Sequence, residues 1–206
     1  MGPTVMAMTT SQHEIVLFHH IQGLTPGVLA FADELRGAGH TVHTPDSFEG
    51  RTFHSIEDGQ AYLGEVGFET VRERGVQAVA DLPAALVYAG FSLGCMPAQK
   101  LVQNRPGALG GLFYHGFADP SWFGEWPAGL GAQIHSMDAD PFFVDEGDLD
   151  AARPFVESHD AVDLFLYPGD GHLFTDSSLA DYDADATKLV IERSLQFLDG
   201  LHGSGR

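Results

Sequence analysis

The sequence predicts a chain of the α/β class, with a mostly parallel central sheet of about six to seven strands and helices on both faces. Short apolar runs alternate with longer segments of helical periodicity along the whole chain. The apolar runs lack regular polar alternation, which is typical of parallel strands buried on both faces. A (β/α)8 barrel would need about eight such units. About six are present, so we expect an open sheet with right-handed crossovers.

The expected strands are short, apolar and bounded by turn residues. They cover residues 14–18, 41–44, 84–89, 109–115, 132–137 and 162–167. The expected helices carry apolar residues at intervals of about three and four. They cover residues 26–37, 58–80, 95–102, 148–157 and 184–201. The first of these helices has Pro26 at its start and Gly37 near its end, where these residue types are favoured.

The composition predicts one globular domain over residues 13–201. The chain has 206 residues, of which 44% are hydrophobic, and this suits a single domain with a substantial core. Residues 1–12 lack the charged start and apolar centre of a secretory signal. We expect them to form a disordered lead, and residues 202–206 to form a disordered tail.

The charge disfavours nucleic-acid and membrane partners, and the cysteine content indicates the compartment. The formal net charge of −19 at pH 7 disfavours binding to nucleic acid and to anionic membranes. No run approaches the roughly 18 apolar residues of a membrane span. The single cysteine, Cys95, excludes an intrachain disulfide and suits a reducing compartment. We expect a cytoplasmic protein that is a monomer or a weak homodimer.

The most informative segment is Gly90-Phe91-Ser92-Leu93-Gly94, which follows an expected strand and precedes an expected helix. A G-x-S-x-G sequence in this context is typical of a nucleophile elbow, because the glycines leave room for a sharp turn that presents the serine hydroxyl at a helix N-terminus. Ser92 is therefore the candidate nucleophile. The alternative is a glycine-rich turn that contains an incidental serine.

A serine nucleophile needs a histidine base and an orienting carboxylate. His172 follows the last expected strand within a glycine-bounded turn, which makes it the candidate base. The acid is Asp138 or Asp140, both of which follow the preceding strand. Asp140 is favoured because it lies further into the loop and is followed by a proline. Asp170 is too close to His172 in sequence to curl back easily, so we interpret it as a turn residue.

Other site residues are expected in the loops that follow the strands. The oxyanion hole would use the backbone N–H groups of Leu93 and Ile21. The possible substrate pocket comprises His20, Gln22, Tyr62, Phe91, His115, Trp122, Phe143 and Leu173. The aromatic residues of the loop at 116–129 either line such a pocket or pack beneath the loop. The histidines at the strand ends lack metal-ligand spacing, so we expect neither a metal nor another cofactor.

With these residues placed, the chain resembles the dienelactone hydrolase family of the α/β-hydrolases from about Glu14 to Leu198. The resemblance rests on five segments in order, at residues 20–24, 45–46, 90–94, 140–144 and 171–174. It implies the α/β-hydrolase fold and a small, lid-free hydrolase that acts on esters or lactones. The short separation between Ser92 and Asp140 agrees, since it leaves no room for an inserted cap domain.

The sequence departs from the family pattern at three places. The founding enzymes carry cysteine at the elbow, whereas this chain has Ser92, and Cys95 is expected to pack inside the following helix. The family's first loop often bears a glutamate at the position of His20. The family's carboxylate-binding arginines are expected near Thr175-Asp176 and at Asp58, and this chain has no cation at either place.

These observations lead to one functional hypothesis and two rivals. We expect a serine hydrolase that cleaves a small, neutral or otherwise non-anionic ester or lactone through an acyl-enzyme. The same triad would also suit thioester or amide hydrolysis, or acyl transfer. A non-catalytic scaffold that binds a ligand or a protein is the rival of a different class, because fold does not fix function.

Overall fold

The central sheet has the strand order β2-β1-β3-β4-β5-β6, and every neighbouring pair within residues 12–201 is parallel. This computed structural model describes residues 12–201, so almost all of the predicted lead and tail lies outside the described residues. The strands are β1 Glu14–Phe18, β2 Thr41–His43, β3 Val87–Phe91, β4 Gly110–Tyr114, β5 Ala132–Met137 and β6 Val162–Tyr167. The predicted α/β class and parallel sheet are confirmed.

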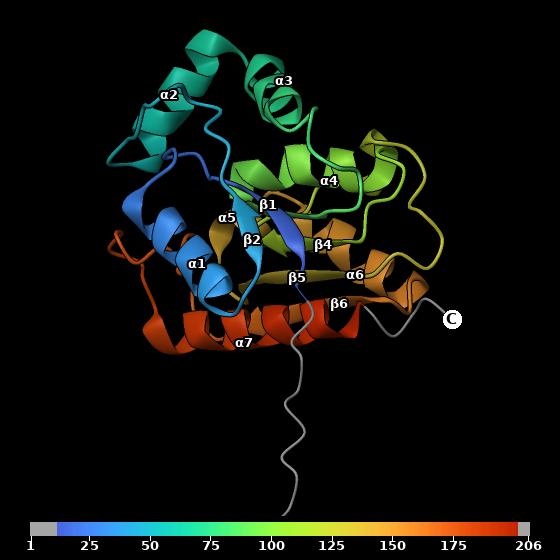
Figure 1. Cartoon of the computed structure of the whole chain (residues 1–206). Helices are drawn as coiled ribbons and strands as arrows, with labels where there is room; N and C mark the ends of the chain where they lie inside the picture. Colours follow the sequence, from blue (N-terminus) through green and yellow to red (C-terminus); the bar gives the residue numbers. More distant parts are fainter. Residues whose placement is uncertain (1–11, 202–206) are drawn as a thin grey trace, which may run out of the picture.

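Helices cover both faces of the sheet (Figure 1). They are α1 Pro26–Gly37, α2 Ile56–Val66, α3 Phe68–Ala78, α4 Cys95–Asn104, α5 Pro141–Val144, α6 Asp148–Ser158 and α7 Ala184–Gly200. Two short 3-10 helices, η1 Ser92–Gly94 and η2 Pro120–Trp122, follow β3 and β4. The described residues contain no inserted cap domain. They also contain no helix that is both long and apolar enough to cross a bilayer.

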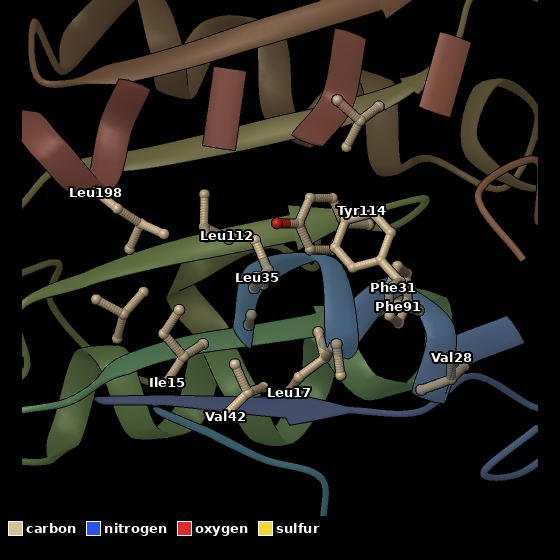
Figure 2. Close-up of a cluster of buried hydrophobic side chains, with 14 of the residues drawn as sticks. Ile15, Leu17, Val28, Phe31, Leu35, Val42, Phe91, Leu112, Tyr114 and Leu198 are labelled. Atoms are coloured by element: carbon tan, nitrogen blue, oxygen red, sulfur yellow. The ribbon is translucent and has the colours of Figure 1, made fainter. Parts of the chain in front are cut away.

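Alternation along the buried strands divides the core into two layers. Leu17 and Ala89 face α1 and α7, where they join a fully packed apolar cluster (Figure 2). Val16 and Tyr88, their neighbours in sequence, face α4 and α6 on the other side. Successive side chains of a strand point to opposite faces, so a strand that is apolar at every position is covered on both faces. This is the pattern from which the parallel sheet was predicted.

The structure corrects the sequence prediction at two elements. The predicted helix over residues 58–80 is two helices, α2 and α3, separated at Gly67, whose φ of 91° ends the first helix. The predicted strand over residues 84–89 is shifted, since β3 runs from Val87 to Phe91. The shift arises because Phe91 still pairs with Tyr114 of β4, so the chain turns only at Ser92.

The chain order of the strands creates a crevice between β1 and β3. After β1 the chain passes to β2 on one side, and it then returns to β3 on the other side of β1. The loops that leave the carboxyl ends of β1 and β3 therefore diverge, which is the usual position of a binding site in an open α/β sheet. Ile21 and Ser92 lie in these two loops.

Candidate active site

The turn after β3 places Ser92 in a strained backbone conformation above the sheet. Its φ is +47°, in the left-handed region that non-glycine residues seldom occupy. The flanking glycines are sterically required. A Cβ on Gly90 would lie 2.1 Å from the Gly94 carbonyl oxygen, and a Cβ on Gly94 would lie 2.5 Å from the Phe18 carbonyl oxygen. The geometry is that of the predicted nucleophile elbow.

A hydrogen-bonded chain joins the side chains of Ser92, His172 and Asp140. Ser92 Oγ lies 2.8 Å from His172 Nε2, and His172 Nδ1 lies 2.8 Å from Asp140 Oδ2. If Nδ1–H donates to the carboxylate, Nε2 is free to accept the serine hydroxyl proton. The Phe142 ring packs against the imidazole with centroids 4.5 Å apart. Loops after β3, β5 and β6 thus bring the three predicted residues together.

The structure brings Asp140, and not Asp138, to His172. Asp140 is fully buried, and its carboxylate also accepts hydrogen bonds from the Phe142 N–H at 2.9 Å and the Ser136 hydroxyl at 3.2 Å. It is the N-cap of α5, and the proline that follows it starts that helix. Asp138 is exposed and instead accepts the Gly169 N–H. The two alternatives therefore differ clearly in geometry.

The predicted oxyanion-hole residues border the same cavity as Ser92 and His172. Leu93 is the second residue of η1, which leads directly into α4. The first N–H groups of a helix have no acceptor within the helix, so the Leu93 N–H is available to a ligand beside Ser92. Ile21 lies in the loop after β1, on the far side of the crevice.

The cavity at the triad is small and has two contrasting walls. Its volume is about 220 Å³. The residues that line it are Ile21, Ile56, Gln60, Leu63, Phe68, Ser92, Leu93, Met96, His115, Gly116, Phe142, Glu146, Asp148 and His172. We call the residues from α2 and α3 (Ile56, Gln60, Leu63 and Phe68) the helical wall, and Glu146 with Asp148 the acidic wall. Among residues 12–201, the cavity lining includes no lysine or arginine.

Of the predicted pocket residues, only His115 lines this cavity. His20, Gln22, Tyr62, Phe91, Trp122, Phe143 and Leu173 do not. Phe91, Phe143 and Leu173 are buried in or beside the core, as expected for apolar side chains on the inner face of an element. Tyr62 is a buried residue of α2 and packs against Phe48.

The remaining predicted pocket residues lie elsewhere for different reasons. The Gln22 side chain donates to the Phe53 carbonyl oxygen, and His20 bonds to Asp176. Trp122 is 67% exposed on η2. Its loop neighbours Phe117 and Trp126 pack in or against the core, as in the packing alternative, whereas Trp122 neither packs there nor lines the cavity.

Sequence reasoning missed both walls of the cavity. The helical wall depends on the break at Gly67, which turns Phe68 toward the site. In the segment Asp140–Val144 the prediction chose Phe143, whereas Phe142 contacts His172. That segment did carry an aromatic signal, but the phase of a four-residue helix could not be deduced from it. Nothing in the sequence near Asp148 indicated a site.

Burial shifts the pKa values of three groups near the triad. It raises the pKa of the Asp148 carboxyl to about 6, although a hydrogen bond from the Phe117 N–H opposes the shift. It raises the pKa of the Cys95 thiol well above its usual value, and this thiol donates to the carbonyl oxygen of Gly90. A buried thiol of this kind is inert. Burial lowers the pKa of His115 well below its usual value, so this imidazole is neutral.

Within residues 12–201, no three His, Cys, Asp or Glu side chains gather in an arrangement that could hold a metal ion. The buried histidines instead have hydrogen-bond partners within the protein. His115 Nε2 lies 2.7 Å from the Thr175 hydroxyl, and His135 Nδ1 lies 2.9 Å from the Tyr167 hydroxyl.

Comparisons with known proteins agree with the fold. The family model of the dienelactone hydrolase family matches residues 3–201. Among proteins with curated functional descriptions, none matches. We describe two of the solved structures that are similar to this chain. A dienelactone hydrolase-like promiscuous phosphotriesterase from metagenomic libraries shares 18% identity and a TM-score of 0.69, over 92% of this chain and 86% of its own.

The second is a dienelactone hydrolase from Anabaena variabilis, with 13% identity and a TM-score of 0.62, over 94% of this chain and 88% of its own. At these identities the two structures establish the fold, whereas the match to the family model covers nearly the whole chain. The resemblance read from the sequence is thereby confirmed. This chain belongs to the dienelactone hydrolase family, whose members are hydrolases with the α/β-hydrolase fold.

Proposed function

We propose that this protein is a serine hydrolase that cleaves a small, non-anionic carboxylic ester or lactone through a covalent acyl-enzyme. One observation carries the proposal. The side chains of Ser92, His172 and Asp140 form a chain of two 2.8 Å hydrogen bonds, and Ser92 and His172 line a cavity. A nucleophile needs a base within this distance, and the base needs an orienting group.

The proposed reaction uses each of these groups in turn. Ser92 Oγ attacks the substrate carbonyl carbon while His172 Nε2 takes the hydroxyl proton. Asp140 then stabilises the imidazolium that forms. The N–H groups of Leu93 and Ile21 donate to the oxyanion. His172 passes its proton to the leaving alkoxide, and water, deprotonated by His172, then hydrolyses the acyl-enzyme and restores Ser92.

The charge of the cavity supports a substrate without negative charge. An anionic group would lie against Glu146 and Asp148 with no lysine or arginine in the described lining to offset the repulsion. The volume of about 220 Å³ suits a small acyl group, because sites for drug-sized ligands typically span roughly 300–1,000 Å³. We therefore expect neutral or cationic small esters and lactones to be the better substrates.

The test is hydrolysis of p-nitrophenyl esters and simple lactones by the wild type and by Ser92→Ala in parallel. The panel includes three p-nitrophenyl esters of similar size whose acyl groups carry an ammonium group, no charge or a carboxylate. Activity that disappears with Ser92→Ala and falls in the order cationic, neutral, anionic supports the proposal. A preference for the anionic ester contradicts the substrate assignment, and activity that survives the substitution contradicts the nucleophile.

The rival chemistries are separated in the same assay. Matched thioesters and amides report whether the acyl carbonyl is cleaved with a different leaving group. An added alcohol acceptor reports acyl transfer as a new ester product. A non-catalytic scaffold would hydrolyse none of these compounds in a Ser92-dependent manner.

A further inference from the structure

A buried pair of side chains joins the loop after β1 to the segment that follows His172. His20 and Asp176 are 1% and 3% exposed, and His20 Nε2 lies 2.7 Å from Asp176 Oδ2. The Gln22 backbone N–H donates to His20 Nδ1 at 3.1 Å. Because Nδ1 accepts this bond, Nε2 carries the proton and donates to the carboxylate. His20 therefore bonds to its own loop and to the loop of the base.

Asp176 is held by donors on both of its oxygens. Besides His20, the Thr25 hydroxyl donates to Oδ2, while the Ser178 N–H at 2.8 Å and hydroxyl at 2.6 Å donate to Oδ1. Burial acts to raise the pKa of this carboxyl, but the bonds from His20, Ser178 and Thr25 outweigh it and lower the pKa to about 2. Any Cβ on Gly27 of α1 would overlap the carboxylate, so the fit is close on this side as well.

A second buried histidine holds the residue before Asp176. His115, at the carboxyl end of β4, lies with Nε2 2.7 Å from the Thr175 hydroxyl. Its ring stacks on Phe91 with centroids 6.0 Å apart, and the His20 ring meets the same phenyl ring edge-on at 6.4 Å. Thr175 and Asp176 are thus each bonded to a buried histidine at the carboxyl end of the sheet. One histidine follows β4 and the other follows β1.

We propose that His20 and Asp176 are positioning residues that hold the oxyanion-hole amide of Ile21 in register with His172. Ile21 directly follows His20, and Asp176 lies four residues after His172. The hydrogen bond between the pair therefore links two catalytic groups that belong to separate loops. This inference rests on the proposed function. The inference also connects two departures from the family pattern. His20 stands where the family often has a glutamate, Asp176 stands near the place of an expected arginine, and the two side chains bond to each other.

The direct test is Asp176→Asn, which preserves the shape of the side chain. In the wild type, His20 and Thr25 donate to one carboxylate oxygen and Ser178 donates twice to the other. The NH2 group of an asparagine would replace one of these oxygens and would face donors in either orientation. The substitution therefore breaks the network without leaving a cavity. The matched control is His135→Gln, which removes a fully buried histidine bonded to Tyr167 outside the cavity.

Three quantities are measured in the full chain, namely kcat, KM and hydrogen exchange at the Gln22 amide. For Asp176→Asn we expect kcat to fall roughly ten- to hundredfold, the usual effect of a small misplacement of catalytic groups, with KM changed by less than about threefold. Exchange at Gln22 should accelerate at least about tenfold, because its acceptor on His20 loses its orientation. His135→Gln should lower thermal stability but leave kcat and Gln22 exchange unchanged.

Should Asp176→Asn fail to fold, His20→Asn replaces it. Its side-chain oxygen can accept the Gln22 N–H in place of Nδ1 but cannot reach Asp176, so only the link between the loops is lost. The same fall in kcat with intact Gln22 protection supports the proposal.

Wild-type kcat in either variant contradicts the positioning role, as does an equal loss of kcat in His135→Gln. If the wild type hydrolyses no ester, the proposed function fails. Gln22 exchange in Asp176→Asn then decides the positioning role alone, and unchanged exchange rejects it.

Discussion

The base and the walls of the cavity are built in different ways. We call Ser92, His172 and Asp140 the base; they follow strands of the sheet and are joined by two hydrogen bonds of 2.8 Å, and the first two line the cavity. The walls come from α2, α3, the segment before α6 and the first residue of α6. They include exposed side chains such as Glu146, and Phe68 is 38% exposed. The strand ends thus fix the groups proposed for chemistry, and surface segments surround the space that a substrate would enter.

Because of this difference, we expect substitutions in the two parts to have different effects on activity. The base is closely packed against the core, since Asp140 is fully buried and a Cβ on Gly94, beside Ser92, would collide with the Phe18 backbone. Ile56 and Leu63 of the helical wall pack on a small cluster with Phe48 and Tyr62 that is distinct from the two layers of the core. The helices α2 and α3 lie at the top of the view in Figure 1. Substitutions at the base should therefore reduce turnover of every substrate, whereas substitutions in the walls should change the preference between substrates.

The largest effect is expected at the base from Ser92→Ala and His172→Ala. Each should lower kcat by about 10⁴ or more, and the double variant should cost little more, because the two residues act as a unit. The measurement is p-nitrophenyl ester hydrolysis under saturating substrate. Cys95→Ala is the control and should stay within about threefold of the wild type, since its buried thiol is inert. A large loss in this control would contradict the assignment of Ser92.

Substitutions of the two aspartates after β5 should lower kcat by clearly different factors, both smaller than the loss in Ser92→Ala. Asp140→Asn should lower kcat by about 10³–10⁴, because the amide favours the wrong tautomer of His172. Asp138→Asn should change kcat by less than about threefold, since this exposed carboxylate only accepts the Gly169 N–H. Both variants are assayed beside the wild type. The reverse order of effects would assign the acid to Asp138.

Substitutions in the acidic wall should change the preference between substrates by a smaller factor than that by which Asp140→Asn lowers kcat. The double variant Glu146→Gln with Asp148→Asn should reduce the preference for a cationic over an anionic ester by about tenfold, which corresponds to roughly 1.4 kcal/mol of differential interaction. The measurement is the ratio of kcat/KM for the two esters. Turnover of the neutral ester should stay within about threefold. An unchanged ratio would mean that the acidic wall does not contact the substrate.

The smallest effect is the pH dependence of that same preference. The pKa of Asp148 is raised to about 6, so its carboxyl is charged above this pH and neutral below it. The preference for a cationic over a neutral ester should therefore increase as the pH rises through 6. Taking the ratio of kcat/KM values cancels the titration of His172, which both esters share. Asp148→Asn should have a flat ratio, and a wild-type ratio without a step near pH 6 would contradict this role for Asp148.

The parts of the molecule that could be predicted are those with local sequence signals. Apolar runs identify buried strands, and the constraint on the turn at Ser92 requires glycines at fixed positions on both sides. Pro141 after Asp140 is a helix-start signal, and it explains why the second aspartate and not the first is buried beside His172. These signals place the base of the cavity without knowledge of the packing.

The walls could not be predicted because they depend on helix phase and on long-range packing. A single glycine, Gly67, separates α2 from α3 and turns Phe68 to the cavity, yet glycine inside a helical pattern is often tolerated. The Phe142-Phe143 pair indicated that this segment contributes an aromatic ring to the site. It did not indicate that Phe142 faces the cavity while Phe143 is buried. The sequence suggested that His20 lines a substrate pocket. Its side chain instead bonds to Asp176, which lies 156 residues away in the sequence and gave no local signal.

The proposed function requires that the environment of Ser92 activates its hydroxyl. The most direct measurement is the intact mass of the wild type, Ser92→Ala and Cys95→Ala after exposure to a fluorophosphonate, followed by mapping of the labelled peptide. We expect a single adduct on Ser92 in the wild type and in Cys95→Ala, and none in Ser92→Ala. An unlabelled wild type, or an adduct that persists in Ser92→Ala, would contradict it.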